Sequence, residues 1–161
     1  MQRANQAWVD GDRIAIFGHS AGGHDVANLL LSREGTPWRA GLMYNGVPDL
    51  LASQKHRPWN PNNVRHLGEL EENRDAWLAQ SPIEHVDSGL DAPLRIHHGT
   101  EETTIPIEHI RGFRDRLEAA GSVEGEEFEY HELPGENHTT QVVAENARNV
   151  TMFVDFLNRR L

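Results

Sequence analysis

The pentapeptide Gly18-His19-Ser20-Ala21-Gly22 has the pattern Gly-x-Ser-x-Gly. In a nucleophile elbow of this pattern, a strand turns sharply into a helix and exposes the serine hydroxyl above the end of the strand. Both glycines are expected to be required, because such a corner leaves no room for β-carbons. The helix N-terminus below the serine favours a developing negative charge. The pattern therefore predicts a nucleophile at Ser20 and an oxyanion-hole donor at the Ala21 N–H.

Two nucleotide-binding alternatives are excluded by the residues that follow. Gly18 and Gly23 have the glycine spacing of a Walker A loop, but the next residues are His24 and Asp25 rather than Lys and Ser or Thr. Such a loop would have neither a cation for the phosphates nor a hydroxyl for Mg²⁺. The sequence also has no Gly-x-Gly-x-x-Gly fingerprint of a dinucleotide site.

A serine nucleophile requires a general base and an acid that orients it, in the chain order Ser, Asp or Glu, His. Because the sequence has ten histidines, position has to select the base. His138 follows the fourth strand-like segment and a Pro-Gly turn, and loops at the carboxyl ends of strands carry the ligand sites of α/β sheets. We therefore expect the base at His138. Four further histidines fall within strand-like or helix-like segments, where packing or surface roles are expected: His97, His98, His109 and His131.

The acid is expected in the loop between Gly99 and Pro106, after the third strand-like segment. Glu101 and Glu102 both lie in this loop, and either side chain could reach the base. The alternative is a solvated acidic loop without a catalytic role. A metal site is not expected, because the chain has no cysteine and no His-Glu-x-x-His motif. No cofactor is implied.

The elements that must position these residues alternate between strand-like and helix-like segments. This alternation predicts an α/β fold with a mainly parallel sheet. Helices are expected after Ser20, over 106–121 with Pro in the first turn and Gly at the end, and over about 140–160. Four short strands are expected at 14–18, 40–45, 94–98 and 128–133.

Residues 50–80 depart from this alternation and are expected to form an excursion between the second and third strands. Residues 50–63 are rich in Pro, Asn and Gln and are predicted to form a loop, whereas residues 64–80 have a helix-like pattern. We expect the excursion to form a wall of a substrate pocket.

Composition limits the classes of partner. The chain has 161 residues, 37% of them hydrophobic, and a formal net charge of −10. This charge disfavours nucleic acid and anionic membranes as partners. The sequence contains neither an apolar segment long enough to span a membrane nor the apolar core of a signal peptide, so a cytoplasmic location is expected.

Three motifs together resemble the catalytic domain of the prolyl oligopeptidase family within the α/β-hydrolases, which is related to the carboxylesterases. They are "WVDGDRIAIFGHSAGG", "SPIEHVDSGLDAPLRIHHGTEETTIP" and "LPGENH", and the similarity extends over about 9–157. The resemblance implies that Ser20 is the nucleophile and His138 the general base. It aligns the acid of the family with Glu102, where the family has Asp.

The chain also departs from this family at its beginning. Family members have several strands before the elbow strand, whereas only residues 1–13 precede it here. The resemblance therefore implies a single partial domain over 1–161, the C-terminal portion of an α/β-hydrolase fold. The missing part would supply the second oxyanion donor and would cover the edge of the first strand. We expect either a fragment, a truncated reading frame, or a half that is completed by another chain or by oligomerisation.

Two hypotheses follow. The first is a serine hydrolase, a peptidase or a carboxylesterase, that cleaves a small ester or a peptide through an acyl-enzyme. The second is a catalytically silent α/β module that binds a partner along its open sheet edge.

Overall fold

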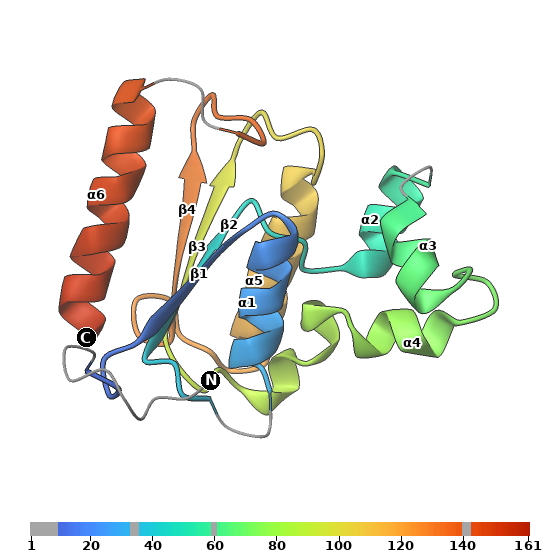
Figure 1. Ribbon diagram of the computed structural model, residues 1–161, viewed down its shortest axis with the longest axis horizontal. Helices are drawn as coiled ribbons and strands as arrows, with labels where there is room; N and C mark the ends of the chain where they lie inside the picture. Colours follow the sequence, from blue (N-terminus) through green and yellow to red (C-terminus); the bar gives the residue numbers. More distant parts are fainter. Residues whose placement is uncertain (1–9, 33–35, 59–60, 140–142) are drawn as a thin grey trace.

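The sheet consists of four parallel strands in the order β1-β2-β3-β4 (Figure 1). The computed structural model describes residues 10–32, 36–58, 61–139 and 143–161. Within them, the strands are β1 (Ala15–His19), β2 (Ala40–Tyr44), β3 (Leu94–Gly99) and β4 (Phe128–Leu133). The α/β class, the parallel sheet and the four expected strands are thus confirmed, with bounds shifted by one residue at most.

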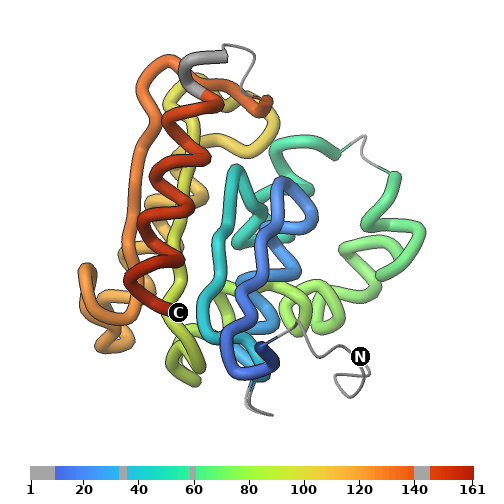
Figure 2. The backbone as a smooth tube through the Cα atoms, turned by 60° about the vertical axis from the view of Figure 1, so that its left-hand side comes forward, coloured from blue at the N-terminus to red at the C-terminus, as the bar shows by residue number. Residues whose placement is uncertain are grey.

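Helices cover both faces of the sheet (Figures 1 and 2). The helices α1 (Ala21–Leu30) and α5 (Ile107–Ala119) lie on one face, and α6 (Val143–Arg160) lies on the other. Because side chains alternate along a strand, Leu94 and Ile96 of β3 enter the core with α1 and α5. On the α6 face, Ala40 and Leu42 of β2 pack against Phe156. Among the described residues, no helix combines the length and the apolar character that a membrane span requires.

The helix ends follow from local backbone chemistry. Pro106 directly precedes α5, and Gly121 with φ of 97° stands after its last turn, where a left-handed residue satisfies the free carbonyls. The expected helix over 106–121 is therefore confirmed. The last helix is confirmed from Val143 onward, and positions 140–142 of that expectation lie outside the described residues.

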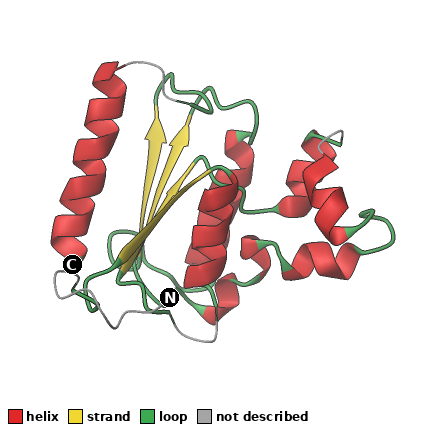
Figure 3. Cartoon of the chain, viewed as in Figure 1, coloured by secondary structure: helices red, strands yellow, loops and turns green. Residues whose placement is uncertain are grey.

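The prediction of a loop over 50–63 is wrong. The excursion contains three short helices, α2 (Leu50–His56), α3 (Pro61–Leu67) and α4 (Arg74–Ala79), which project to one side of the sheet (Figure 3). Asp49 caps α2 by accepting a hydrogen bond of 2.9 Å from the Ala52 N–H. Leu50 and Leu51 then pack against the fully buried Trp77 of α4. The polar composition of residues 50–63 gave no indication of α2. This helix is stabilised by its contact with α4, which lies outside that segment.

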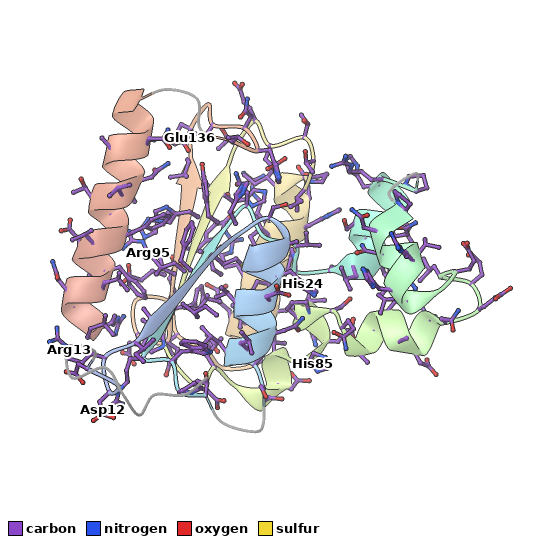
Figure 4. The ribbon with its side chains drawn as sticks, in the orientation of Figure 1. Asp12, Arg13, His24, His85, Arg95 and Glu136 are labelled. Atoms are coloured by element: carbon purple, nitrogen blue, oxygen red, sulfur yellow. The ribbon has the colours of Figure 1, made fainter. Side chains whose placement is uncertain are left out.

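A buried charged network lies between the sheet and α6. Arg95 of β3 donates from Nε to Nε2 of His97 over 2.8 Å and forms an ion pair of 3.0 Å with Glu129 of β4. Figure 4 shows Arg95 between the strands and α6. Since Nε2 of His97 accepts this bond, its imidazole is neutral. Burial, and then the charge of Arg95, lowers the pKa of His97 from 6.5 to about 3.

His97 is expected to make the fold sensitive to acid. Above pH 6.5 both the folded and the unfolded imidazole are neutral, so the group has no effect there. As the pH falls from 6.5 toward 3, only the unfolded chain takes up the proton, and stability is lost. From this group alone we expect a loss of about 1 kcal/mol in the free energy of unfolding between about pH 7.5 and 5.5.

Urea denaturation at the two pH values measures this loss. His97→Gln keeps an acceptor for Arg95 but does not titrate. In this variant the free energy of unfolding should therefore change less between the two pH values, by the amount that we expect from His97. His66→Gln, at an exposed histidine, serves as the control and should leave the pH dependence of the free energy of unfolding unchanged. An identical pH dependence in wild type and His97→Gln would contradict the prediction.

Candidate active site

Ser20 occupies the corner between β1 and α1. Its φ of 57° and ψ of −119° place it in a strained region, and within the described part of the chain only Asn45 shares a positive φ among non-glycine residues. Two main-chain hydrogen bonds hold the corner: Ser20 N–H donates to the Tyr44 carbonyl over 3.0 Å, and His24 N–H donates to the Ser20 carbonyl over 3.1 Å. This geometry is that of a nucleophile elbow.

The corner leaves no room for a β-carbon at Gly18 or at Gly23. A β-carbon on Gly18 would lie 1.9 Å from the Gly22 carbonyl oxygen, and one on Gly23 would lie 2.8 Å from the Gly46 Cα. A β-carbon on Gly22 would meet no atom within 4 Å. The expectation that Gly22 is needed for space is therefore wrong, because a β-carbon at this position would lie in open space.

Glu102 and His138 meet above the sheet. Nδ1 of His138 donates to Oε2 of Glu102 over 2.5 Å, and the Glu102 side chain is fully buried. The other carboxylate oxygen, Oε1, accepts the N–H groups of Thr104 and Ile105. This pair of bonds turns the longer glutamate side chain back toward the imidazole. Glu101, by contrast, is exposed.

The elbow and the histidine loop come together because β1 and β4 end at the same edge of the sheet. Nε2 of His19, the residue before Ser20, donates to the His138 carbonyl over 2.7 Å, and the two imidazole centroids lie 4.8 Å apart. The imidazole of His138 is 28% exposed on this edge. An imidazole held by a buried carboxylate can accept the proton of a hydroxyl that comes within hydrogen-bond reach.

The other histidines occupy different roles in the structure. His98 is fully buried and donates from Nε2 to the Ile105 carbonyl over 2.8 Å, and burial lowers its pKa. His97 and His131 belong to the network around Arg95. His24, on α1 (Figure 4), donates to the Val47 carbonyl and accepts from Asn28.

A cavity of about 500 Å³ opens beside the elbow. Its lining includes Ser20 and Ala21 of the elbow and Ser53 and His66 of the excursion. The cavity therefore lies where a ligand would contact both the serine and α2 and α3. Within the described residues, no group of three or more His, Cys, Asp or Glu is arranged to hold a metal ion.

Sequence reasoning missed three polar residues that lie in the loop of His138 or contact it. His19 lies within the elbow motif, Asn45 is the first residue after β2, and Glu136 lies two positions before His138. Asn45 is fully buried and Glu136 is 2% exposed. A signal existed for Asn45, since it is a polar residue at the carboxyl end of an apolar strand, where α/β sheets place functional groups.

The comparison with protein families agrees with this geometry. Residues 2–161 match the prolyl oligopeptidase family, Peptidase_S9. The chain belongs to this family. Its four parallel strands and flanking helices are those of the α/β-hydrolase fold, and acylaminoacyl peptidase of Pyrococcus horikoshii superposes with a TM-score of 0.80 at 20% identity, over 95% of this chain and 24% of the peptidase.

Two curated relatives of this chain are named for different activities. Esterase LipC of Mycobacterium tuberculosis is 30% identical over 154 residues, which cover 84% of this chain and 37% of LipC. A probable dipeptidyl-aminopeptidase B of Pyrenophora teres f. teres is 26% identical over 137 residues, which cover 84% of this chain and 14% of that protein. The chain thus spans little more than a third of LipC and a smaller share of the peptidases.

The geometry of the elbow predicts opposite effects on stability for substitutions at its two glycines. Gly18→Ala places a methyl group against the Gly22 carbonyl and should destabilise the protein by on the order of 3 kcal/mol. Gly22→Ala, the matched control, places the same group in open space on α1 and should stabilise it by up to about 1 kcal/mol. Thermal unfolding followed by circular dichroism measures both. Equal destabilisation by the two substitutions would contradict this account of the corner.

Proposed function

We propose that the chain is the catalytic part of a serine hydrolase that cleaves an ester or a peptide bond through an acyl-enzyme. The observation that carries the proposal is the bond between Nδ1 of His138 and the buried carboxylate of Glu102, on the sheet edge where Ser20 occupies the strained elbow. Membership of the prolyl oligopeptidase family supports it.

In the proposed mechanism, Oγ of Ser20 attacks the substrate carbonyl carbon while its proton moves to Nε2 of His138. Glu102 orients the imidazole and offsets its positive charge, and the Ala21 N–H donates to the oxyanion. The tetrahedral intermediate then expels an alcohol or an amine, which takes the proton from His138. Water, activated by the same imidazole, releases the acid and restores the hydroxyl of Ser20.

Two observations support the assignment of Glu102 as the acid, although family members have Asp in the aligned position. Its Oε1 is fixed by two main-chain N–H groups, which compensates for the additional methylene group. Its neighbour Glu101 is exposed. The relatives include both esterase LipC and a probable dipeptidyl-aminopeptidase B, so the proposal covers both ester and peptide substrates.

The second candidate is a catalytically silent module that binds a partner along the β1 edge. Phe17 favours it, because this aromatic side chain is 55% exposed on the edge strand of the sheet. Exposed strand edges are templates for pairing with another chain.

A fluorophosphonate probe distinguishes the two candidates, because it reacts covalently with an activated serine. We expect the folded protein to be labelled, and Ser20→Ala to abolish labelling. His138→Gln should slow labelling by on the order of 10⁴-fold or more. A folded wild-type protein that the probe does not label would contradict the hydrolase and favour the silent module. Circular dichroism checks the fold of each variant.

The two adjacent glutamates provide a matched pair for the acid. Glu102→Gln removes the carboxylate that orients His138 and should reduce the labelling rate roughly 10⁴-fold. Glu101→Gln removes an exposed carboxylate from the same loop and should leave the rate unchanged. If Glu101→Gln reduced the labelling rate and Glu102→Gln did not, the acid would be Glu101. The same variants, assayed with a p-nitrophenyl ester and a peptide anilide, compare the two substrate classes.

A further inference from the structure

The loop that carries His138 is anchored two residues before the imidazole. The buried carboxylate of Glu136 accepts hydrogen bonds from the Tyr44 hydroxyl of β2 and from Arg148 and Asn149 of α6, at 3.0, 2.6 and 2.9 Å. These three donors satisfy a charge that would be costly to bury alone. They fix the beginning of the loop, but they do not reach His138.

Asn45 makes a contact that does reach His138. Its Nδ2 donates to the carbonyls of Asn137 and His138 over 3.0 and 3.1 Å. Its Oδ1 accepts the Gly99 N–H over 2.9 Å, at the end of β3, where the loop of Glu102 begins. One buried side chain therefore connects the origin of the Glu102 loop to the main chain of His138.

The chemistry of this position requires asparagine. The side chain has to present one acceptor and two donors, and the primary amides of Asn and Gln have both. The backbone has a φ of 43°, a left-handed region that Asn and Asp adopt more readily than other non-glycine residues. Asp would satisfy the backbone and the Gly99 N–H but would supply no donors.

A second donor binds the same carbonyl. Nε2 of His19 donates to the His138 oxygen over 2.7 Å, so this one oxygen accepts bonds from both β1 and the residue after β2. Fixing the carbonyl of His138 limits rotation of its backbone. It thereby limits the directions in which the imidazole can point.

We propose that Asn45 is a positioning residue, which aims the His138 imidazole at Glu102 by holding the main-chain carbonyl of His138. His19 assists it from the elbow. The proposal rests on the proposed function for its consequence in catalysis, but the alignment of His138 with Glu102 is measurable without catalysis. A merely structural Asn45 would stabilise the fold without controlling this alignment.

The test uses Asn45→Asp, which keeps the backbone preference and the acceptor for Gly99 but removes both donors. The first readout is the ¹H NMR signal of the Nδ1 proton of His138, because a proton in a short histidine–carboxylate bond resonates far downfield. The signal is assigned by its loss in His138→Gln. We expect it in the wild type and expect it to disappear in folded Asn45→Asp. The second readout is the fluorophosphonate labelling rate, which should fall about 100-fold.

Two further variants keep the test decisive. Asn45→Gly also tolerates the positive φ and replaces Asn45→Asp if that variant does not fold. Ile110→Val lowers the stability of the core between α1 and α5 and should retain both the signal and the rate. This control separates loss of stability from loss of alignment.

The outcomes separate this inference from the proposed function. The positioning role is overturned if the Asn45 variant keeps both the Nδ1 proton signal and the labelling rate. It is also overturned if the folded wild type lacks the signal. A wild type that shows the signal but is not labelled overturns the hydrolase. Loss of the signal on substitution of Asn45 would still support the positioning role in that case.

Discussion

The parallel pairing of the four strands is the constraint on which the site depends. Parallel strands require crossover connections, so every strand ends at the same edge of the sheet. The elbow follows β1, Asn45 follows β2, and the loops of Glu102 and His138 follow β3 and β4. As a result, His19 and His138 are in contact although 119 positions separate them in the sequence. An antiparallel β4 would carry its loop to the opposite end of the sheet.

Burial of charge is the second organising feature, and the structure satisfies each of two buried carboxylates with several donors. The carboxylates of Glu102 and Glu136 have fully buried side chains. Glu102 accepts bonds from two main-chain N–H groups and one imidazole, and Glu136 from three side chains. Losing a donor around such a group leaves charge uncompensated, which is more costly than losing an exposed pair. Hydrogen bonds to these two carboxylates therefore help to hold the loops at this edge.

Local signals in the sequence were sufficient for the four strands and for the helices α1, α5 and α6, and they singled out two of the proposed catalytic residues. The short apolar runs predicted all four strands, and the glycine pattern predicted the corner at Ser20. The same reasoning failed at Gly22, because a pattern cannot show which glycine faces the neighbouring backbone. It failed at α2 because the helix is stabilised by Trp77, from a distant segment. Glu101 and Glu102 were equivalent by residue type, and only the resemblance to a family favoured Glu102.

The sequence by itself determined the α/β alternation, the elbow and the position of a histidine after the last strand. These features depend on periodicity and on residues close together in the chain, which is the information that a sequence carries directly. The tertiary structure decided that Glu102 rather than Glu101 faces His138, and that Asn45 and His19 hold the His138 carbonyl. These contacts join the ends of different strands, so they exist only once strand order, register and loop burial are fixed.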